Sequence, residues 1–262
     1  MITRSLPAIL VMSLFLACAW IFMAPSRSQA ATTAITTYDV EMGVMREGLV
    51  LVKETITLHV ADASPTEMPR AFSLEQEAPP TFAVNIQTVR LDGIDAPFTA
   101  PSEENKYTLT VPVNDRLISG EHTLYLEYSI SDLIAYGPES DGFAWNVTGD
   151  AWFMPILQAK AVILLPGAAD IIDQNASTGR WDNPSKRFFL GSTQEGRPIF
   201  ETSSPLLPGE RLFIELTWPK GVVEQGGGPS LLLGAGMALA AALLSALLIL
   251  VHRRRNRGSE TG

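Results

Sequence analysis

Residues 49–60 read LVLVKETITLHV, and the alternation in this stretch decides the fold of the region around it. Every second residue from Val50 to Val60 is apolar, with Glu54 as the exception. A period of two places these side chains on one face of a β-strand. We therefore predict a strand with one buried face. The carboxylate of Glu54 on that face needs a partner, because an unpaired buried charge is costly.

The stretch TAITTYDVEMGV (residues 33–44) alternates in the same way, and the pair Glu47-Gly48 separates the two runs. Two alternating runs around such a pair predict a β-hairpin. Further alternating runs follow, and Gly- and Pro-rich turns separate them. They are NKYTLTVPV (105–113), GEHTLYLEYSIS (120–131), AKAVILLP (159–166) and RLFIELTW (211–218). We predict an all-β fold, an antiparallel β-sandwich over residues 31–223, with a weak internal boundary near residue 166.

The N-terminus resembles a secretory signal peptide. Arg4 precedes a long apolar run, and small residues lie at Ser28 and Ala30. This pattern predicts a signal peptide over residues 1–30 with cleavage after Ala30, although the length of the run also suits an uncleaved helix. Cys18 is the single cysteine, and a mature protein that has lost it would contain no disulfide.

The C-terminus predicts a membrane anchor. Residues 231–251 are uncharged and long enough to cross a bilayer as a helix, and a Gly-rich linker (224–230) precedes them. Four cations follow in the tail 252–262: Arg253, Arg254, Arg255 and Arg257. Cations flank the cytoplasmic side of a span. The sequence therefore predicts a single-pass protein of the cytoplasmic (inner) membrane, with its β domain outside and its tail in the cytoplasm. The alternative is a C-terminal sorting signal that a protease removes.

The charge of the chain is strongly negative outside the tail. Its formal net charge is −9, and residues 31–230 hold 13 Lys and Arg against 27 Asp and Glu. An acidic surface repels the phosphates of nucleic acids. We therefore exclude nucleic acid as a partner.

Residues for chemistry are few. The three histidines are His59, His122 and His252, and the sequence holds no HExxH or Cys-rich metal motif. Acids gather near one segment at Glu139, Asp141 and Asp150. They are weak candidates for a calcium site or for a glycosidase pair, with a solvated acidic loop as the alternative.

Two tryptophans, Trp145 and Trp152, flank the same segment. Their rings would either stack on a sugar or a partner, or pack in the core. We expect no bound cofactor apart from this calcium alternative.

A succession of short motifs resembles the extracytoplasmic domain of the YciQ-like predicted membrane proteins, a bacterial family of unknown function. These motifs are ITTYDVEMGVMREGLVLVKETITLHV, MPRAFSL, GEHTLYLEYSI, FAWNVTGDAWFMPI, VILLPG and LTWPKGVV. The resemblance implies a signal, a β-rich domain and membrane helices, and it implies no catalytic residue. Members of that family continue beyond their first span, and we expect any role of that further region to be absent here or to belong to another chain.

The resemblance also bears on Glu54. The family pattern has an acidic residue mid-strand at this position and an arginine at the position of Arg70. A guanidinium can bond a carboxylate through two parallel hydrogen bonds. We therefore expect Glu54 and Arg70 to form a buried, structural ion pair, with a ligand site around the pair as the alternative.

The function that the sequence favours is a non-enzymatic interaction or envelope-assembly module. Its partners would be the membrane and another envelope or membrane protein. The alternative is a protein that binds or cleaves envelope glycans through the acids near Trp145.

Overall fold

The computed structural model describes residues 33–61, 67–73, 82–103, 106–113 and 117–225. No helix within these ranges is long and apolar enough to cross a membrane. The expected signal peptide, most of the linker, the transmembrane helix and the basic tail lie outside the described residues.

The expected hairpin forms the centre of the larger sheet. β1 (Ala34–Val44) and β2 (Val50–Val60) pair antiparallel, from Val44 opposite Val50 to Ala34 opposite His59. The turn closes with the Met45 amide donating to the Leu49 carbonyl oxygen (2.8 Å). Gly48 adopts a φ of 87° there, which glycine tolerates without strain. Alternate residues of β2 are buried, as the period of two predicts.

Among the described residues, eight strands form one sheet in the order β14-β15-β11-β1-β2-β8-β4-β5. Its other members are β4 (Ala83–Leu91), β5 (Ile94–Asp95), β8 (Gly120–Ser131), β11 (Ala159–Leu164), β14 (Phe188–Ser192) and β15 (Pro198–Thr202). The all-β prediction is confirmed, with one difference. β1 and β11 run parallel, because the chain returns through a second layer before β11 enters beside β1.

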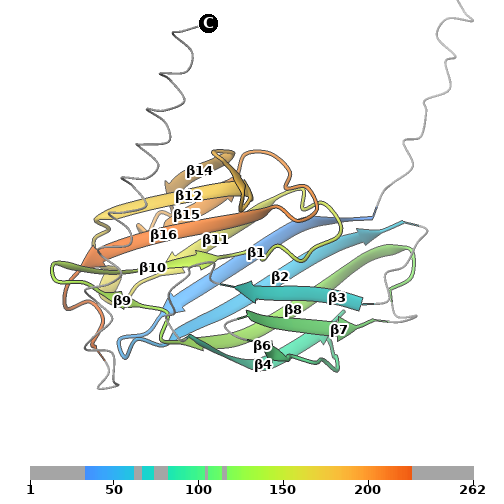
Figure 1. The fold of residues 1–262 in the computed structure, drawn as a ribbon, viewed down its shortest axis with the longest axis horizontal. Coiled ribbons are helices and arrows are strands. Elements are labelled where there is room, and N and C mark those ends of the chain that lie inside the picture. Colours follow the sequence, from blue (N-terminus) through green and yellow to red (C-terminus); the bar gives the residue numbers. More distant parts are fainter. Residues whose placement is uncertain (1–32, 62–66, 74–81, 104–105, 114–116, 226–262) are drawn as a thin grey trace, which may run out of the picture. The chain divides into compact units, whose positions relative to one another are not determined.

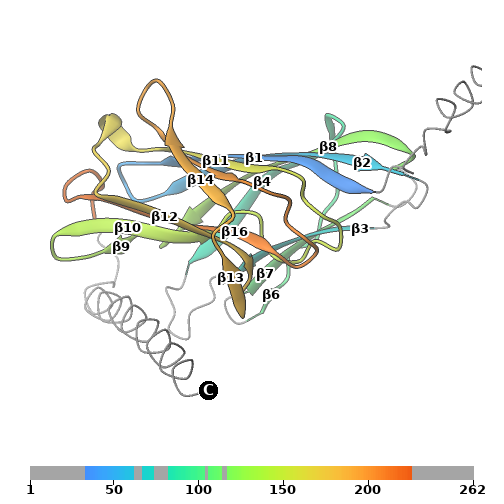
Figure 2. The same cartoon turned by 90° about the horizontal axis from the view of Figure 1, so that it is seen from above.

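The second layer holds two smaller sheets in the described part of the chain. One has the order β13-β12-β16-β10-β9 and the other β3-β7-β6. Their strands are β3 (Glu67–Ser73), β6 (Ser102–Glu103), β7 (Lys106–Pro112), β9 (Ala135–Tyr136), β10 (Ser140–Asn146), β12 (Asp173–Arg180), β13 (Asn183–Ser185) and β16 (Arg211–Pro219). In Figure 1 the layers are seen face-on, and in Figure 2, from above, they are seen edge-on.

The core lies between the layers. Trp145, Trp152 and Trp218 are at most 2% exposed and are among the largest buried side chains. Phe82 meets Trp145 edge to face at 5.6 Å between ring centroids, a favoured arrangement of aromatic rings. The 3-10 turn at Pro166–Ala168 follows β11 and lies at the boundary expected near residue 166. Strands that precede this turn and strands that follow it are found together in the eight-stranded sheet and in the five-stranded sheet.

Candidate functional site

Glu54 lies at the middle of β2, on the face that the second layer covers, and its side chain is fully buried. β2 is flanked by β1 and β8. Glu54 is opposite Val40 on β1 and opposite Leu126 on β8. Tyr38 and Tyr128 therefore occupy diagonal positions two residues away on the same face, within reach of long side chains.

Both tyrosines donate to the carboxylate of Glu54. The Tyr38 hydroxyl donates to Oε2 at 2.6 Å, and the Tyr128 hydroxyl donates to Oε1 at 2.5 Å. These are the short distances expected when a hydroxyl meets an ionised acceptor. The eight-stranded sheet thus supplies a carboxylate and two donors from three adjacent strands.

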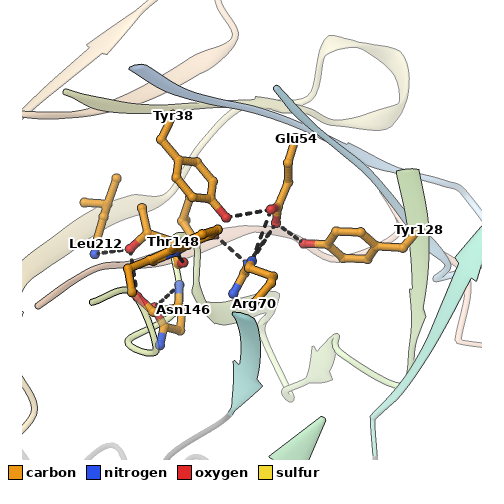
Figure 3. A network of polar contacts seen from close by, with 10 residues as sticks. Tyr38, Glu54, Arg70, Tyr128, Asn146, Thr148 and Leu212 are labelled. Atoms are coloured by element: carbon orange, nitrogen blue, oxygen red, sulfur yellow. Dashed lines mark hydrogen bonds and ion pairs between the residues drawn. The ribbon is translucent and has the colours of Figure 1, made fainter. Parts of the chain in front are cut away.

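Arg70 reaches this carboxylate from β3, in the opposite layer (Figure 3). Its Nη2 donates to Glu54 Oε1 at 2.8 Å, and its Nε lies 3.1 Å from Oε2 and 3.2 Å from Oε1. Both side chains are 0% exposed. The structure thus brings together the two residues that the sequence suggested as a pair. We name the four residues Tyr38, Glu54, Arg70 and Tyr128 the Glu54 cluster.

The same guanidinium extends to the five-stranded sheet. Arg70 Nη2 donates to the backbone oxygen of Val147, directly after β10, at 2.7 Å. The loop beyond is held by side chains of its own. Asn146 Oδ1 accepts from the Gly149 amide at 3.0 Å, and Trp152 Nε1 donates to the Thr148 carbonyl oxygen at 2.7 Å. Arg70, on the three-stranded sheet, therefore contacts a strand of the eight-stranded sheet and the residue that follows β10 of the five-stranded sheet.

The electrostatics of the cluster keep every donor protonated. Burial raises the pKa of Tyr38 and of Tyr128 well above the usual value for tyrosine; the charge of Glu54 also raises both values, and the charge of Arg70 opposes this. Burial lowers the pKa of Arg70, but Glu54 and the two tyrosines together raise it by more, so the net shift is upward. The two phenols stay neutral hydrogen-bond donors and the guanidinium stays charged.

This arrangement leaves little chemistry open. Both oxygens of Glu54 accept two or more hydrogen bonds, and the side chains of the cluster are fully buried. Two surface hollows, of about 470 and 390 Å³, are lined by residues between 163 and 198 and contain no member of the cluster. A general base needs a free lone pair within reach of a substrate proton. The geometry therefore fits a structural tie between sheets better than a catalytic or ligand site.

Of the two alternatives for Trp145 and Trp152, the structure shows both rings packed in the core. Trp145 is 0% exposed and Trp152 is 2% exposed. Trp152 packs edge to face against Tyr38 with 5.9 Å between ring centroids. Both rings lie on the inner side of the layers because alternation in β10 and the tight loop after it turn them inward. They complete the core around the Glu54 cluster.

Among the described residues, the acids near this segment do not gather into a metal site. No group of three or more His, Cys, Asp or Glu residues there is arranged to hold a metal. Asp141 is buried at the start of β10 and accepts from Lys220 Nζ at 2.8 Å. Glu139 precedes β10 and Asp150 follows its far end.

The sequence did not predict a polar contact between His122, which is buried, and Asp92, which is 43% exposed. His122 Nδ1 lies 2.8 Å from Asp92 Oδ2, and Nε2 lies 2.8 Å from the Ile118 carbonyl oxygen. Two acceptors around one ring favour the imidazolium, which donates from both nitrogens. Burial lowers the pKa of His122, but the bond to Asp92 and the bond to Ile118 raise it by more.

The sequence also missed Tyr38 and Tyr128 as partners of Glu54. Their inward positions followed from alternation, but their contact with the carboxylate depends on the strand register. For Tyr38 the hairpin turn supplies that register. For Tyr128 it depends on β8, which is 60 residues further along the chain than β2 at the closest ends and has no local signal.

Comparison with known proteins gives a family. The description "Predicted membrane protein (DUF2207) N-terminal domain" matches residues 34–218. The chain belongs to this family. DUF2207 proteins are predicted membrane proteins without an established function, and the matched region coincides with the β domain. No curated protein sequence matches the chain.

Solved structures give weak likenesses. Leukotriene A4 hydrolase from Saccharomyces cerevisiae matches 81% of this chain, at 13% identity and a TM-score of 0.41. An M1 zinc metallopeptidase from Deinococcus radiodurans matches 70% of this chain, at 10% identity and a TM-score of 0.37. The chain spans 33% and 42% of these two proteins. These values support no inference about the function of the DUF2207 domain.

Proposed function

We propose that this protein is a membrane-anchored interaction or assembly module of the cell envelope that performs no catalysis itself. One observation carries the proposal: the Glu54 cluster is closed. The ionised groups that the sequence places on a buried face satisfy one another, and they line neither of the two hollows described above. A cluster of this kind fixes the packing of sheets, and it leaves recognition to the surface.

The family supports the membrane part of the proposal, because DUF2207 proteins are predicted membrane proteins. We further propose a kinship with the YciQ-like proteins, a signal peptide over residues 1–30, a single span over residues 231–251 and display outside the inner membrane. Intact-mass measurement of the mature protein would test cleavage after Ala30 and retention of the span.

Surface residues supply a basis for recognition. Large hydrophobic side chains are exposed in adjoining segments, for example Phe153 (52%), Leu157 (46%) and Leu207 (60%). Backbone hydrogen bonds between Ile156 and Leu206, 2.9 and 2.8 Å, place these segments side by side. Exposed apolar residues that gather on one surface are typical of interaction sites.

Chemical crosslinking in cells tests the proposal. The full chain is crosslinked, captured and identified with its partners by mass spectrometry, beside a control that carries the same β domain on an unrelated membrane anchor. We expect a defined membrane or envelope protein to be captured with both anchors. Capture of nothing specific, or release of sugar from envelope glycans by the purified chain, would contradict the proposal.

A further inference from the structure

The edges of the sheets differ in how well they are protected. An unpaired strand edge presents free N–H and C=O groups to any other extended chain, and proteins protect such edges with charge, proline or very short strands. Among the described strands, β5, β6 and β9 are two residues long, β13 contains Pro184 and β3 contains Pro69. β14 (Phe188–Ser192) ends the eight-stranded sheet with five residues, FFLGS, and has none of these protections.

The backbone of β14 shows which groups face outward. Ser203 donates to the Arg187 carbonyl oxygen at 3.0 Å, and Thr193 donates to the Arg197 carbonyl oxygen at 2.9 Å, at the two ends of the β14–β15 pairing. In an antiparallel pair, hydrogen bonds to one neighbour involve alternate residues. The backbone groups of Phe188, Leu190 and Ser192 therefore point away from β15. No backbone hydrogen bond of the described residues engages them outside the strand pairing.

The side chains of β14 leave this edge open. Phe189 is 65% exposed and Leu190 is 39% exposed. A Cβ atom added at Gly191 would meet no atom within 4 Å. The hollow of about 470 Å³ borders Gly191 and Ser192. An apolar strand with free outward backbone groups and open space beside it is a template for strand addition.

We propose that two copies of this chain pair through β14, antiparallel and with Leu190 opposite Leu190 of the second copy. This register forms one continuous sheet across a two-fold axis. Each copy contributes the same edge to the interface. It places Phe188 opposite Ser192 and brings no charged side chains together within the strand. Continued beyond the strand, the register sets Arg187 opposite Thr193, so like charges still do not meet.

The chemistry of the edge favours a second copy. Its sequence is neutral and apolar, whereas the domain around it is acidic. A charged partner peptide would gain nothing from an uncharged edge, and self-pairing satisfies the outward backbone groups of both copies at once. A second copy would thus be one partner of the interaction module proposed above, and the pairing rests on that proposed function.

Disulfide trapping tests the pairing in the full chain in its membrane. Cys18→Ser removes the native cysteine, and Leu190→Cys is added to it. Leu190 would form a hydrogen-bonded pair with its counterpart, with Cα atoms about 5.5 Å apart, which suits a disulfide. Ser192→Cys is the matched control, because two copies of residue 192 would lie about 13 Å apart along the strands.

We expect mild oxidation to trap most of the Leu190→Cys chain as a dimer and at least ten times less of the Ser192→Cys chain. Equal trapping at both positions, or trapping at neither, would overturn the proposal. Leu190→Lys provides a measurement without cysteines: like charges at the two-fold axis should convert the detergent-purified chain from dimer to monomer. A wild-type chain that is already monomeric there would also overturn the pairing.

The two proposals fail separately. If trapping fails while crosslinking still captures a different membrane protein, the β14 pairing is wrong and the interaction role stands. If β14 pairs as proposed and no other protein is captured, the β14 pairing stands and the proposed envelope partner is wrong. Retained buried-tryptophan fluorescence in each variant shows that the fold survives the substitution.

Discussion

Replacing Arg70 by Ala should strongly destabilise the domain. The substitution removes the hydrogen bonds from Nη2 and Nε to Glu54 and the bond from Nη2 to the Val147 carbonyl oxygen. Glu54 would keep its two tyrosine donors but lose its counter-charge at a site with 0% exposure. Removal of one partner from a buried ion pair costs about 3–5 kcal/mol. This is a large share of the roughly 5–15 kcal/mol that stabilises a typical domain.

Thermal unfolding of the full chain in detergent provides the assay. Trp145, Trp152 and Trp218 are buried, so their fluorescence reports on the loss of the core. A loss of about 3–5 kcal/mol lowers the midpoint by about 6–20 °C, at roughly 2–4 °C for each kcal/mol in a domain of this size. The control is Arg90→Ala, which breaks the exposed pair with Asp95 and should leave the midpoint nearly unchanged.

A companion variant separates the lost charge from the lost volume. Arg70→Met keeps much of the stem but leaves Glu54 as an unpaired buried charge. Glu54→Gln combined with Arg70→Met removes both charges, and the double variant should be more stable than Arg70→Met alone. An Arg70→Ala chain with the wild-type midpoint, or a double variant less stable than the single one, would refute the reasoning.

Further predictions concern other parts of the domain. The raised pKa of His122 means that its bond to Asp92 stabilises the fold fully below the unfolded pKa of about 6.5 and that this contribution is lost as the pH rises through the folded pKa. The midpoint difference between wild type and His122→Gln should therefore be larger at acidic than at alkaline pH, and an unchanged difference would contradict this. Tyr38→Phe should cost about 1.5–3 kcal/mol, the value of a hydrogen bond to a charged group. In an alkaline titration up to about pH 11, the absorbance change from tyrosine ionisation should be the same in Tyr38→Phe and wild type. The reason is that burial raises the pKa of this phenol well above the usual value of about 10, so Tyr38 does not ionise in that range. Gly142→Ala should cost about 1–3 kcal/mol, since its Cβ would lie 2.5 Å from a backbone oxygen. Gly191→Ala, which meets nothing within 4 Å, is its matched control and should unfold like the wild type.

Local alternation was sufficient to predict the hairpin. Its two runs share one face, and the pair Glu47-Gly48 fixes where the chain turns, so strands and register follow from nearby residues. The parallel contact between β1 and β11 did not follow. It joins strands that are more than a hundred residues apart in the sequence. Alternation shows which face of a strand is buried, but it does not show which strand lies beside it.

The Glu54 cluster shows the same limit. A carboxylate in an apolar row needs a partner that satisfies its charge. This requirement, together with the family resemblance, predicted Arg70 as the partner of Glu54. The tyrosine donor from β8 and the Val147 carbonyl oxygen come from segments whose approach is set by the packing of the layers. The two tryptophans show a related limit. The sequence left open whether their rings lie at the surface or in the core, and their burial depends on the packing of the two layers.

Hydrogen exchange measured by mass spectrometry on the full chain, wild type against Arg70→Met, tests the central claim most directly. If the Glu54 cluster ties the three sheets together, backbone amides of β3, β7 and the loop at residues 146–152 will exchange faster in the variant, while the β1–β2 turn stays as in the wild type. If exchange is unchanged throughout and the variant instead loses a captured partner, the cluster is a recognition site and the structural account is wrong.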